Sequence, residues 1–426
     1  MTELTPKGVR DFLPEEKIVR DKIIDILKKS FELYGYNPLE TPALERIEIL
    51  ASKYAGGEEI LKEIFKLKDQ GGRDLGLRYD LTVPFARVIA MNPNLKMPFK
   101  RYQIDRVWRD GPIKLGRYRE FYQADVDVVG IKSVGIEAEI LALTKFVFDK
   151  LNFDVVIEVN NRKLLNKLIE FSGVKNDRAD DVILSLDKLK KMGEGEVVKE
   201  LQAKGIDRKT IDKLMKLISI SGENGEILNE LEKNLGKCEG IDELKELLKL
   251  AKEFGVEIEI TPTLARGLSY YTGTVYEVYL KKSQIKSSIA AGGRFDKMVG
   301  LLLERNEEFP AVGISFGIDV IADAIKLEGK IKSRKSVVDV YVVPIGDVMP
   351  KAISLLQALR REGIKADMDL MGKGVTKNLS FANSYGIRYA IFLGENELKE
   401  KKVKLRDMEK GEEKLLSVDE VVKILK

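Results

Sequence analysis

The chain has 426 residues, of which 44% are hydrophobic, and this length suggests about three domains. It contains no run of about 18 apolar residues that could span a membrane. Its first residues, MTELTPKGVRDFLPEEK, lack the apolar core of a signal peptide. A single cysteine, Cys238, excludes an internal disulfide and a multi-cysteine zinc site. The sequence therefore predicts a cytoplasmic protein with no membrane segment.

The formal net charge is +4, and the chain contains no histidine. The absence of histidine excludes a catalytic imidazole, a Ser-His-Asp triad and a histidine metal site. Any acid–base chemistry must therefore use carboxylates, lysine, tyrosine or the substrate itself. Because the net charge is small, a nucleic-acid partner would be bound by local patches rather than by a global field.

The first third of the chain predicts a helix followed by strands. Residues 15–34 carry apolar side chains at helical spacing, and an extended stretch with two prolines, GYNPLETPALE, follows. Residues 100–109 and 117–130 alternate as strands and predict a hairpin with a long connection that ends in glycine, DGPIKLG.

The rest of the chain changes pattern twice. Amphipathic helical segments separated by polar turns fill residues 161–254 and indicate a helical insertion that includes Cys238. Strand patterns return at 256–280 and 287–291, and 311–327 predicts a strand that turns into a helix. After a charged linker, residues 333–426 alternate strands and helices, which is typical of a compact α/β domain. Basic residues outnumber acidic ones there, which permits a phosphate-contacting patch.

One strand, GRYREFYQADVDVVG, has two unlike faces because side chains alternate along a strand. One face is mostly apolar, and the other carries Arg117, Arg119, Phe121, Gln123, Asp125 and Asp127. A solvated face with paired charges is one interpretation, and Asp125 in particular could simply pair with an arginine.

Other segments add side chains of the same chemistry to this polar face. Arg109 ends the preceding strand, and GLRYDLTVPFAR contributes Asp80 and Thr82. TLARGLSYYTGTVYEVY contains Arg266, and SIAAGGRFD contains Arg294. The arginine fork suits carboxylates and phosphates, and tyrosine offers an apolar wall with a polar tip. Together these residue types predict a pocket for a small charged ligand.

These motifs resemble those of histidyl-tRNA synthetases, a class II aminoacyl-tRNA synthetase family, over essentially the whole chain. KGVRDFLPEE resembles the N-terminal signature, YGYNPLETPALE resembles motif 1, and RVWRDGPIKLGRYREFYQADVDVVG resembles motif 2. LARGLSYYTGTVYE and SIAAGGRFD resemble the two histidine-binding signatures. The resemblance implies an α+β catalytic domain over 1–330, an antiparallel sheet flanked by helices, with the helical insertion at about 161–254. It also implies an anticodon-binding α/β domain at 333–426 and a homodimer formed through motif 1.

The resemblance also implies a reaction and roles for individual residues. The expected activity is histidine–tRNA ligation, with L-histidine, ATP accompanied by Mg²⁺, and tRNA(His) as partners. Asp80, Thr82 and Gln123 would bind the ammonium of histidine, and Asp127 and Tyr271 would bind its imidazole. Arg109 and Arg266 would contact the carboxylate and the α-phosphate as catalytic groups, and Arg117 would reach the outer phosphates. Tyr270 and Tyr271 should point to opposite faces, so at least one of them belongs to the core, and Tyr271 is the favoured ligand contact.

Two positions depart from the family pattern. Ser269 replaces an acid, and Val320 follows Asp319 where the family's motif 3 has an arginine that holds the γ-phosphate of ATP. Either another arginine, such as Arg294, substitutes for it, or activation is weakened. The alternative function is that of a non-catalytic paralogue that binds histidine and regulates ATP phosphoribosyltransferase. Such paralogues usually lack the anticodon-binding domain.

Overall fold

The computed structural model describes residues 4–51, 58–113, 116–267, 270–329 and 334–426. The chain forms two compact units. The first comprises Met1–Arg10 and Ile23–Lys330, and the second comprises Asp11–Lys22 and Ile331–Lys426. The helical insertion lies within the first unit.

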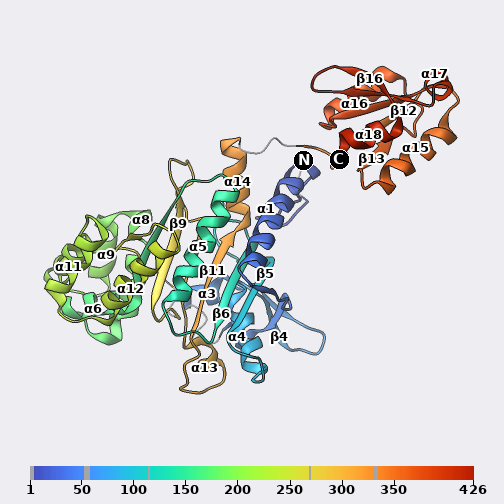
Figure 1. The fold of residues 1–426 in the computed structure, drawn as a ribbon. Helices are drawn as coiled ribbons and strands as arrows, with labels where there is room; N and C mark the ends of the chain where they lie inside the picture. Colours follow the sequence, from blue (N-terminus) through green and yellow to red (C-terminus); the bar gives the residue numbers. More distant parts are fainter. Residues whose placement is uncertain (1–3, 52–57, 114–115, 268–269, 330–333) are drawn as a thin grey trace. The chain divides into compact units, whose positions relative to one another are not determined.

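The first unit is built on an eight-stranded sheet with the order β1-β5-β6-β11-β10-β9-β7-β8 (Figure 1). Its strands are β1 (Asn37–Pro38), β5 (Phe99–Trp108), β6 (Glu120–Val129), β7 (Val155–Asn161), β8 (Glu259–Ile260), β9 (Thr274–Leu280), β10 (Ala290–Arg294) and β11 (Ala311–Gly317). The strands from β5 to β7 pair antiparallel, as expected, but the two edge strands pair parallel with β5 and β7. The prediction of a sheet flanked by helices is confirmed, and the sheet is mixed rather than purely antiparallel.

Helices cover the apolar face of this sheet. The C-terminal half of α1 (Pro14–Leu33) places the Phe31 ring 5.7 Å from Tyr102 on β5 and 5.6 Å from Phe316 on β11. Helix α5 (Gly135–Lys150) adds Phe148, whose ring lies 5.8 Å from Phe316. Helices α12 (Glu239–Glu253) and α14 (Ile318–Glu328) contact the same sheet. These aromatic contacts leave the opposite face of β6, with Gln123, Asp125 and Asp127, as the polar face, which we call the site face.

Short elements surround the sheet in the first half of the chain. A three-stranded sheet consists of β2 (Leu44–Arg46), β4 (Asp74–Leu77) and β3 (Lys66–Lys68), in that order. The helices here are α2 (Ile47–Leu50), α3 (Glu58–Glu63) and α4 (Thr82–Met91), and α4 contacts the later α13 (Met298–Leu302). Phe85 of α4 and Tyr270 share a buried apolar cluster with Met298.

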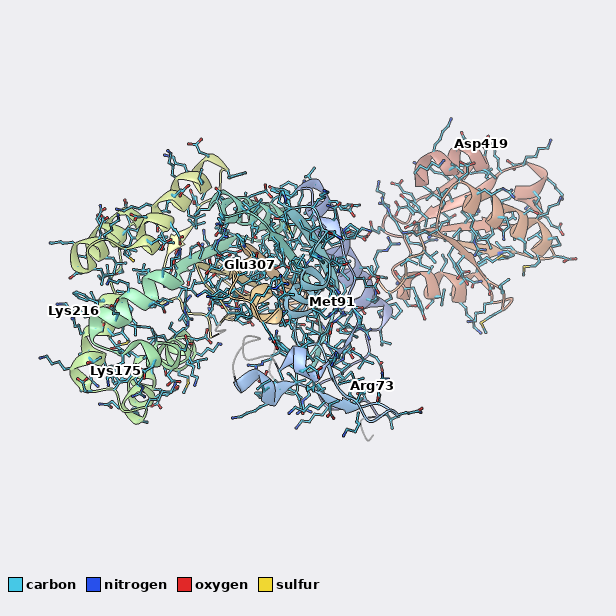
Figure 2. All side chains as sticks on the ribbon, turned by 90° about the horizontal axis from the view of Figure 1, so that it is seen from below. Arg73, Met91, Lys175, Lys216, Glu307 and Asp419 are labelled. Carbon is cyan, nitrogen blue, oxygen red and sulfur yellow. The ribbon has the colours of Figure 1, made fainter. Side chains whose placement is uncertain are left out.

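Between β7 and β8 the chain forms the helical insertion, on which Figure 2 labels Lys175 and Lys216. Its segments are α6 (Arg162–Ser172), the 3-10 turn Asn176–Arg178, α7 (Ala179–Leu186), α8 (Leu189–Met192), α9 (Glu194–Ala203), α10 (Arg208–Ile218), α11 (Asn224–Leu235) and α12. Apolar residues recur every three to four positions on these helices and form a common core, so Cys238 at the start of α12 is buried.

The second unit contains a five-stranded sheet with the order β13-β12-β14-β15-β16. Its strands are β12 (Val340–Pro344), β13 (Ala366–Met368), β14 (Tyr389–Leu393), β15 (Val403–Asp407) and β16 (Glu413–Leu416). Its helices after the linker are α15 (Met349–Arg361), α16 (Val375–Ser384), α17 (Glu395–Lys399) and α18 (Val418–Leu425). Two apolar clusters, around Val342 and Val343, lie on the two faces of this sheet, as expected for alternating strands and helices.

Candidate active site

Asp80 lies at the centre of the site, immediately before α4. Its Oδ1 accepts hydrogen bonds from the backbone N–H groups of Thr82 and Val83, at 3.2 and 3.0 Å. These are orphan donors of the first helical turn, so the sequence DLTV fixes the carboxylate at the helix start. Burial raises the pKa of Asp80, while the two N–H groups and Arg109 act in the opposite direction. One carboxylate oxygen of Asp80 thus anchors the start of the helix.

The site face of β6 meets a buried arginine on β5. Arg101 stands directly opposite Asp127 in the strand register, and its Nη2 lies 2.5 Å from Asp127 Oδ2. The same guanidinium donates to Leu81 O at 2.9 Å and lies 4.5 Å from the Phe85 ring centre. Burial raises the pKa of Asp127, and Arg101 opposes that rise. Asp127 is therefore held as one partner of a buried ion pair.

Three acceptors of β6 on this face have no hydrogen-bond partner among the described residues. They are the buried atoms Gln123 Oε1, Asp125 Oδ1 and Asp127 Oδ2, the last of which lies within ion-pair distance of Arg101. Burial raises the pKa of Asp125, and the nearby charge of Asp127 adds to that rise. A buried acceptor without a donor costs free energy, so these atoms mark a place where a ligand could donate hydrogen bonds.

Two glycines make room for these side chains. A Cβ atom at Gly313 on β11 would lie 1.9 Å from Asp127 Oδ1, and one at Gly293 on β10 would lie 2.8 Å from the Tyr271 ring. Only glycine permits such close approach of a side chain to the backbone. The glycines of AVGIS and AAGGR therefore form the floor beneath Asp127 and Tyr271.

Arg266 is nearly enclosed by acidic and aromatic neighbours. Its Nη1 forms an ion pair with Glu277 on β9, and its guanidinium carbon lies 6.0 Å from the Tyr271 ring centre. Asp187, which follows α7 of the insertion, interacts with it electrostatically. Burial lowers the pKa of Arg266, but Tyr271, Glu277 and Asp187 together hold it above its ordinary value. Arg266 is therefore a fixed positive charge at the edge of the site face.

Tyr270 and Tyr271 are both buried, with ring centres 4.7 Å apart. Tyr270 also packs against Phe295 in the apolar cluster beneath α4. Tyr271 belongs to the same cluster and also lies beside Arg266, and both tyrosines interact electrostatically with Asp80. Asp80 therefore links Arg109 and Asp127 on one side with the tyrosines and Arg266 on the other.

Arg109 and Arg117 lie at the end of the β5–β6 hairpin. Arg109 Nε donates to Tyr79 O at 3.0 Å, and its guanidinium lies 5.2 Å from the Phe121 ring centre. Burial lowers the pKa of Arg109, and the nearby charges of Asp80 and Glu63 oppose that lowering. Arg117 Nη2 donates to Glu63 at 3.0 Å, and its side chain is 48% exposed. An exposed ion pair of this kind contributes little to stability. Arg117 can therefore exchange Glu63 for a phosphate at a small cost in free energy.

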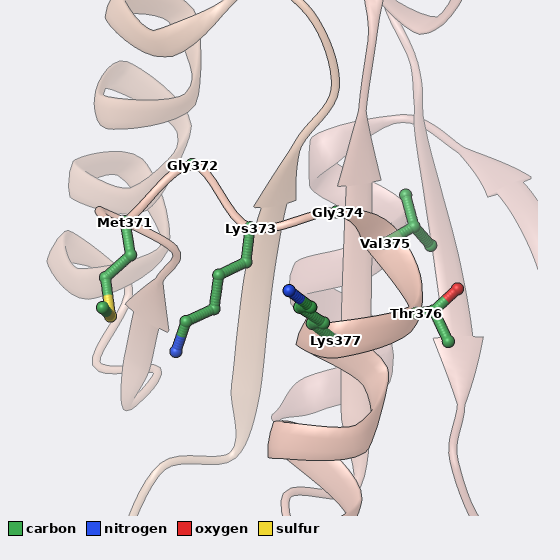
Figure 3. A pocket seen from close by; sticks show the side chains of 7 residues that line it. All are labelled: Met371, Gly372, Lys373, Gly374, Val375, Thr376 and Lys377. Atoms are coloured by element: carbon green, nitrogen blue, oxygen red, sulfur yellow. The ribbon is translucent and has the colours of Figure 1, made fainter.

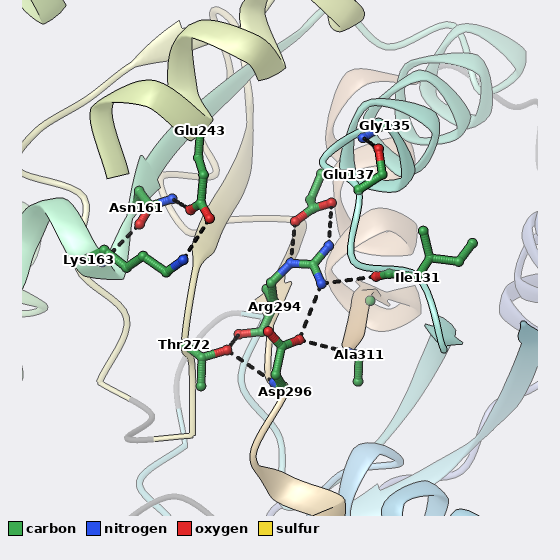
Figure 4. A network of polar contacts seen from close by, with 12 residues as sticks. Ile131, Gly135, Glu137, Asn161, Lys163, Glu243, Thr272, Arg294, Asp296 and Ala311 are labelled. Atoms are coloured by element: carbon green, nitrogen blue, oxygen red, sulfur yellow. Dashed lines mark hydrogen bonds and ion pairs between the residues drawn. The ribbon is translucent and has the colours of Figure 1, made fainter. Parts of the chain in front are cut away.

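Arg294 is engaged elsewhere, as Figure 4 shows. Its Nε and Nη2 donate to Glu137 at 2.6 and 2.7 Å, and its Nη1 donates to Ile131 O and Asp296 at 3.1 and 3.3 Å. A buried bidentate pair that loses one partner leaves the other charge uncompensated. These contacts favour a structural role that ties β10 to α5, and an ATP contact by Arg294 stays a prediction.

The segment that corresponds to motif 3 carries Asp319 and Val320, and Asp319 is bound to neighbouring parts of the chain. Asp319 accepts from the backbone N–H of Tyr122 at 2.8 Å and from Arg10 Nη2 at 3.4 Å. Val320 is 7% exposed. Asp319 therefore ties the start of α14 to β6. Ser269, the other departure, lies outside the described residues.

The sequence interpretation missed three residues, Arg101, Glu277 and Asp187. A signal existed for Glu277, which is the one charged residue of β9, whereas Arg101 shares β5 with Lys100, Asp105 and Arg106 and does not stand out. Their meaning depends on which strand lies beside them, and the sequence does not show that. Asp187 had no signal, since its place depends on how the insertion folds back.

No group of three acidic or cysteine side chains that could hold a metal ion gathers within residues 4–51, 58–113, 116–267, 270–329 and 334–426. In the same part of the chain, no helix is long and apolar enough to cross a membrane.

Comparison with known proteins gives the same family along nearly the whole chain. The family model described as histidyl-tRNA synthetase matches residues 8–321, and the anticodon binding domain model matches residues 339–426. Histidine–tRNA ligase 1 of Bacillus cereus (strain ATCC 10987 / NRS 248) is 44% identical over 411 residues, covering 96% of this chain and 93% of that protein.

Solved structures agree with this. The histidyl-tRNA synthetase of Nostoc sp. PCC 7120 superposes with a TM-score of 0.87 at 32% identity, covering 100% of this chain and 99% of that one. A Bacillus halodurans structure titled as an ATP phosphoribosyltransferase regulatory subunit/histidyl-tRNA synthetase superposes with a TM-score of 0.76, at 24% identity and covering 92% and 98%. The second likeness concerns the fold alone.

Proposed function

Because this chain belongs to the histidyl-tRNA synthetase family, we propose that the site on its eight-stranded sheet activates histidine with ATP and transfers it to tRNA. The chain is accordingly an aminoacyl-tRNA ligase. The observation that carries the assignment of the site is the position of Asp80, which interacts electrostatically with Arg109, Asp127 and both tyrosines.

The bound histidine would present its ammonium to acceptors and its ring to the β6 face. Asp80, Thr82 and Gln123 would accept from the ammonium, and the unpartnered Oε1 of Gln123 supports this. Neutral imidazole needs one acceptor and one donor. Asp127, whose Oδ2 has no hydrogen-bond partner among the described residues, would accept from the ring N–H, and Tyr271 O–H would donate to the other nitrogen.

In the first step, a carboxylate oxygen of histidine would attack the α-phosphorus of ATP. The new oxygen–phosphorus bond would form as the bond to the bridging oxygen breaks, and pyrophosphate would leave with that electron pair. Negative charge grows on the α-phosphoryl oxygens in the transition state, where fixed cations contribute most. Arg109 and Arg266 would supply those cations, and Arg117 would bind the outer phosphates.

In the second step, a ribose hydroxyl of the terminal adenosine of tRNA would attack the acyl carbon, and AMP would leave. The hydroxyl proton needs a base, and the chain has no histidine to provide one. A phosphate oxygen of the adenylate would take this proton and depart with it on AMP. The ATP would carry Mg²⁺, as the resemblance implies, which would neutralise charge on the outer phosphates beside Arg117.

We expect ATP–pyrophosphate exchange with histidine and with none of the other nineteen common amino acids. The ring acceptor and donor on the site face reject side chains that lack both groups. Exchange assayed with each of the twenty amino acids in turn checks this. Histidine binding without exchange would instead indicate a regulatory protein of the same fold.

The second unit would bind the anticodon of the tRNA. A hollow of about 570 Å³ is lined by Met371–Lys377, where Lys373 and Lys377 project from the loop and the first turn of α16 (Figure 3). Asp369 shapes this loop, because its carboxylate accepts from the N–H groups of Met371 and Lys373 at 2.8 and 2.6 Å. Two lysines on a fixed loop suit a phosphate backbone.

Replacing both Lys373 and Lys377 by alanine should therefore raise the KM for tRNA about tenfold or more and flatten its dependence on salt. Histidine-dependent exchange, which needs no tRNA, should keep its rate. Aminoacylation at several salt concentrations measures both effects. The matched control replaces the exposed Lys351 and Lys365 in the same unit, which removes the same charge elsewhere. Equal effects of the two double variants would contradict a local phosphate site.

We further propose a cytoplasmic homodimer. Large apolar side chains are exposed on the first unit, among them Leu44, Leu67 and Met91 at 49, 43 and 68%. Leu44 belongs to the segment that resembles motif 1, so a partner subunit could cover it. Sedimentation equilibrium of the whole chain tests the dimer.

A further inference from the structure

A hollow lies beside Val320, at the position where the family's motif 3 has an arginine. It has a volume of about 240 Å³ and is lined by Gly116, Gln284, Ile285, Lys286, Ser287 and Val320. A Cβ atom at Gly116 would lie 3.2 Å from Val320 Cγ2, so the β5–β6 connection packs directly on α14 here. Gly116 precedes Arg117, the residue assigned to the outer phosphates of ATP. The hollow therefore lies beside the place where those phosphates would be bound.

Two arginines that could have replaced the missing one have other partners. Arg294 is held by Glu137 and Asp296, and Arg10 donates to Asp319 while lying 4.1 Å from the Tyr118 ring centre. Val320 itself contributes an apolar wall. The one cation among the residues lining the hollow is Lys286, which is exposed. No acidic side chain of the described residues lies within ion-pair distance of its ammonium.

We propose that Lys286 contacts the outer phosphates of ATP and supplies the positive charge that an arginine at position 320 would otherwise supply. This inference rests on the proposed function of the site. A lysine ammonium is a point charge on a flexible stem, so it can reach a phosphate from a segment where a rigid arginine fork is not required. The apolar walls of Val320 and Ile285 exclude water on one side, which strengthens the attraction. Ser287 adds a hydroxyl donor in the same lining.

Lys286→Ala should raise the KM for ATP and for pyrophosphate in histidine-dependent exchange by roughly tenfold to a hundredfold, the range for hydrogen bonds to charged groups. The KM for histidine should not change. Lys286→Arg should keep most of the affinity. The matched control, Lys281→Ala, removes a lysine of the same segment that pairs with exposed Asp154 at 3.5 Å, and it should resemble the wild type.

Two further measurements separate this role of Lys286 from a general disturbance of the site. Calorimetry should show that Lys286→Ala weakens binding of ATP but leaves binding of AMP, which has no outer phosphates, unchanged. Val320→Arg added to Lys286→Ala should recover part of the lost ATP affinity, because it returns a cation to the same hollow. Equal weakening of ATP and AMP, or unchanged ATP parameters, would overturn the proposal. Selective loss of ATP binding in a protein that exchanges with no amino acid would uphold Lys286 and refute the proposed function.

Discussion

Arg266→Ala is expected to lower the rate of histidine-dependent exchange by roughly a hundredfold to a thousandfold, with a much smaller effect on histidine binding. The guanidinium is fixed by Glu277 and lies beside Tyr271, so it needs no reorganisation when charge develops on the α-phosphate. A preorganised donor of this kind contributes most in the transition state. Steady-state exchange, with kcat and KM separated for histidine and ATP, measures the effect.

The control is Arg208→Ala, which removes an arginine of the insertion that pairs with Asp212 on the surface and should leave the rate unchanged. Glu277→Gln tests positioning, because it keeps the size of the side chain but removes the charge that holds Arg266. Its rate should fall by less than that of Arg266→Ala. A normal kcat in Arg266→Ala with only a raised KM for histidine would show that Arg266 binds the ground state and nothing more.

Local patterns were enough to predict that one face of β6 is polar and the other apolar. Alternation along β6 separated Gln123, Asp125 and Asp127 from the apolar side chains, and the structure buries that apolar side against α1 and α5. The α+β class and the C-terminal domain were also predictable, because helical and strand periodicities change abruptly at about 161 and 333. The resemblance to a known family then indicated how these separate segments come together in the fold.

What the sequence could not show depends on pairings between distant strands. Arg101 is one of four charged residues in β5 until the register places it opposite Asp127, 26 positions later in the chain. Arg294 resembles a ligand-binding residue beside two glycines, but α5 brings Glu137 to it from 157 positions away. The parallel pairing of the edge strands was also missed, because β1 and β8 have only two residues each and carry no alternation.

Asp127 should provide most of the discrimination for histidine, and its replacement is expected to lower histidine activation by orders of magnitude. A site that accepts a hydrogen bond from a substrate N–H rejects analogues without it far better than an apolar pocket does. The notable complication is Arg101, which is fully buried against Asp127. Asp127→Ala would leave this charge uncompensated and destabilise the fold.

Asp127→Asn is therefore the sharper variant, with Asp127→Ala in comparison. Asparagine keeps the size and one acceptor oxygen but loses the negative charge that stabilises the ring N–H contact. Histidine-dependent exchange should fall strongly in both variants, and calorimetric ATP binding should persist in Asp127→Asn. The thermal unfolding midpoint should fall more in Asp127→Ala. Arg101→Met combined with Asp127→Ala removes both charges, so it should recover stability without recovering activity.

The contact itself can be observed because the chain has no histidine. In the complex of the unlabelled protein with ¹⁵N-labelled histidine, every imidazole signal comes from the substrate. The two ring nitrogens report which of them carries a proton, and their shifts follow the charge of the ring during a pH titration. The nearby carboxylate favours the charged ring and burial disfavours it, so the wild-type titration reflects their balance. Removing the charge of Asp127 should shift that titration to lower pH. Identical shifts and titrations in wild type and Asp127→Asn would show that Asp127 is not the partner of the ring, and the specificity pocket would have to lie elsewhere on the sheet.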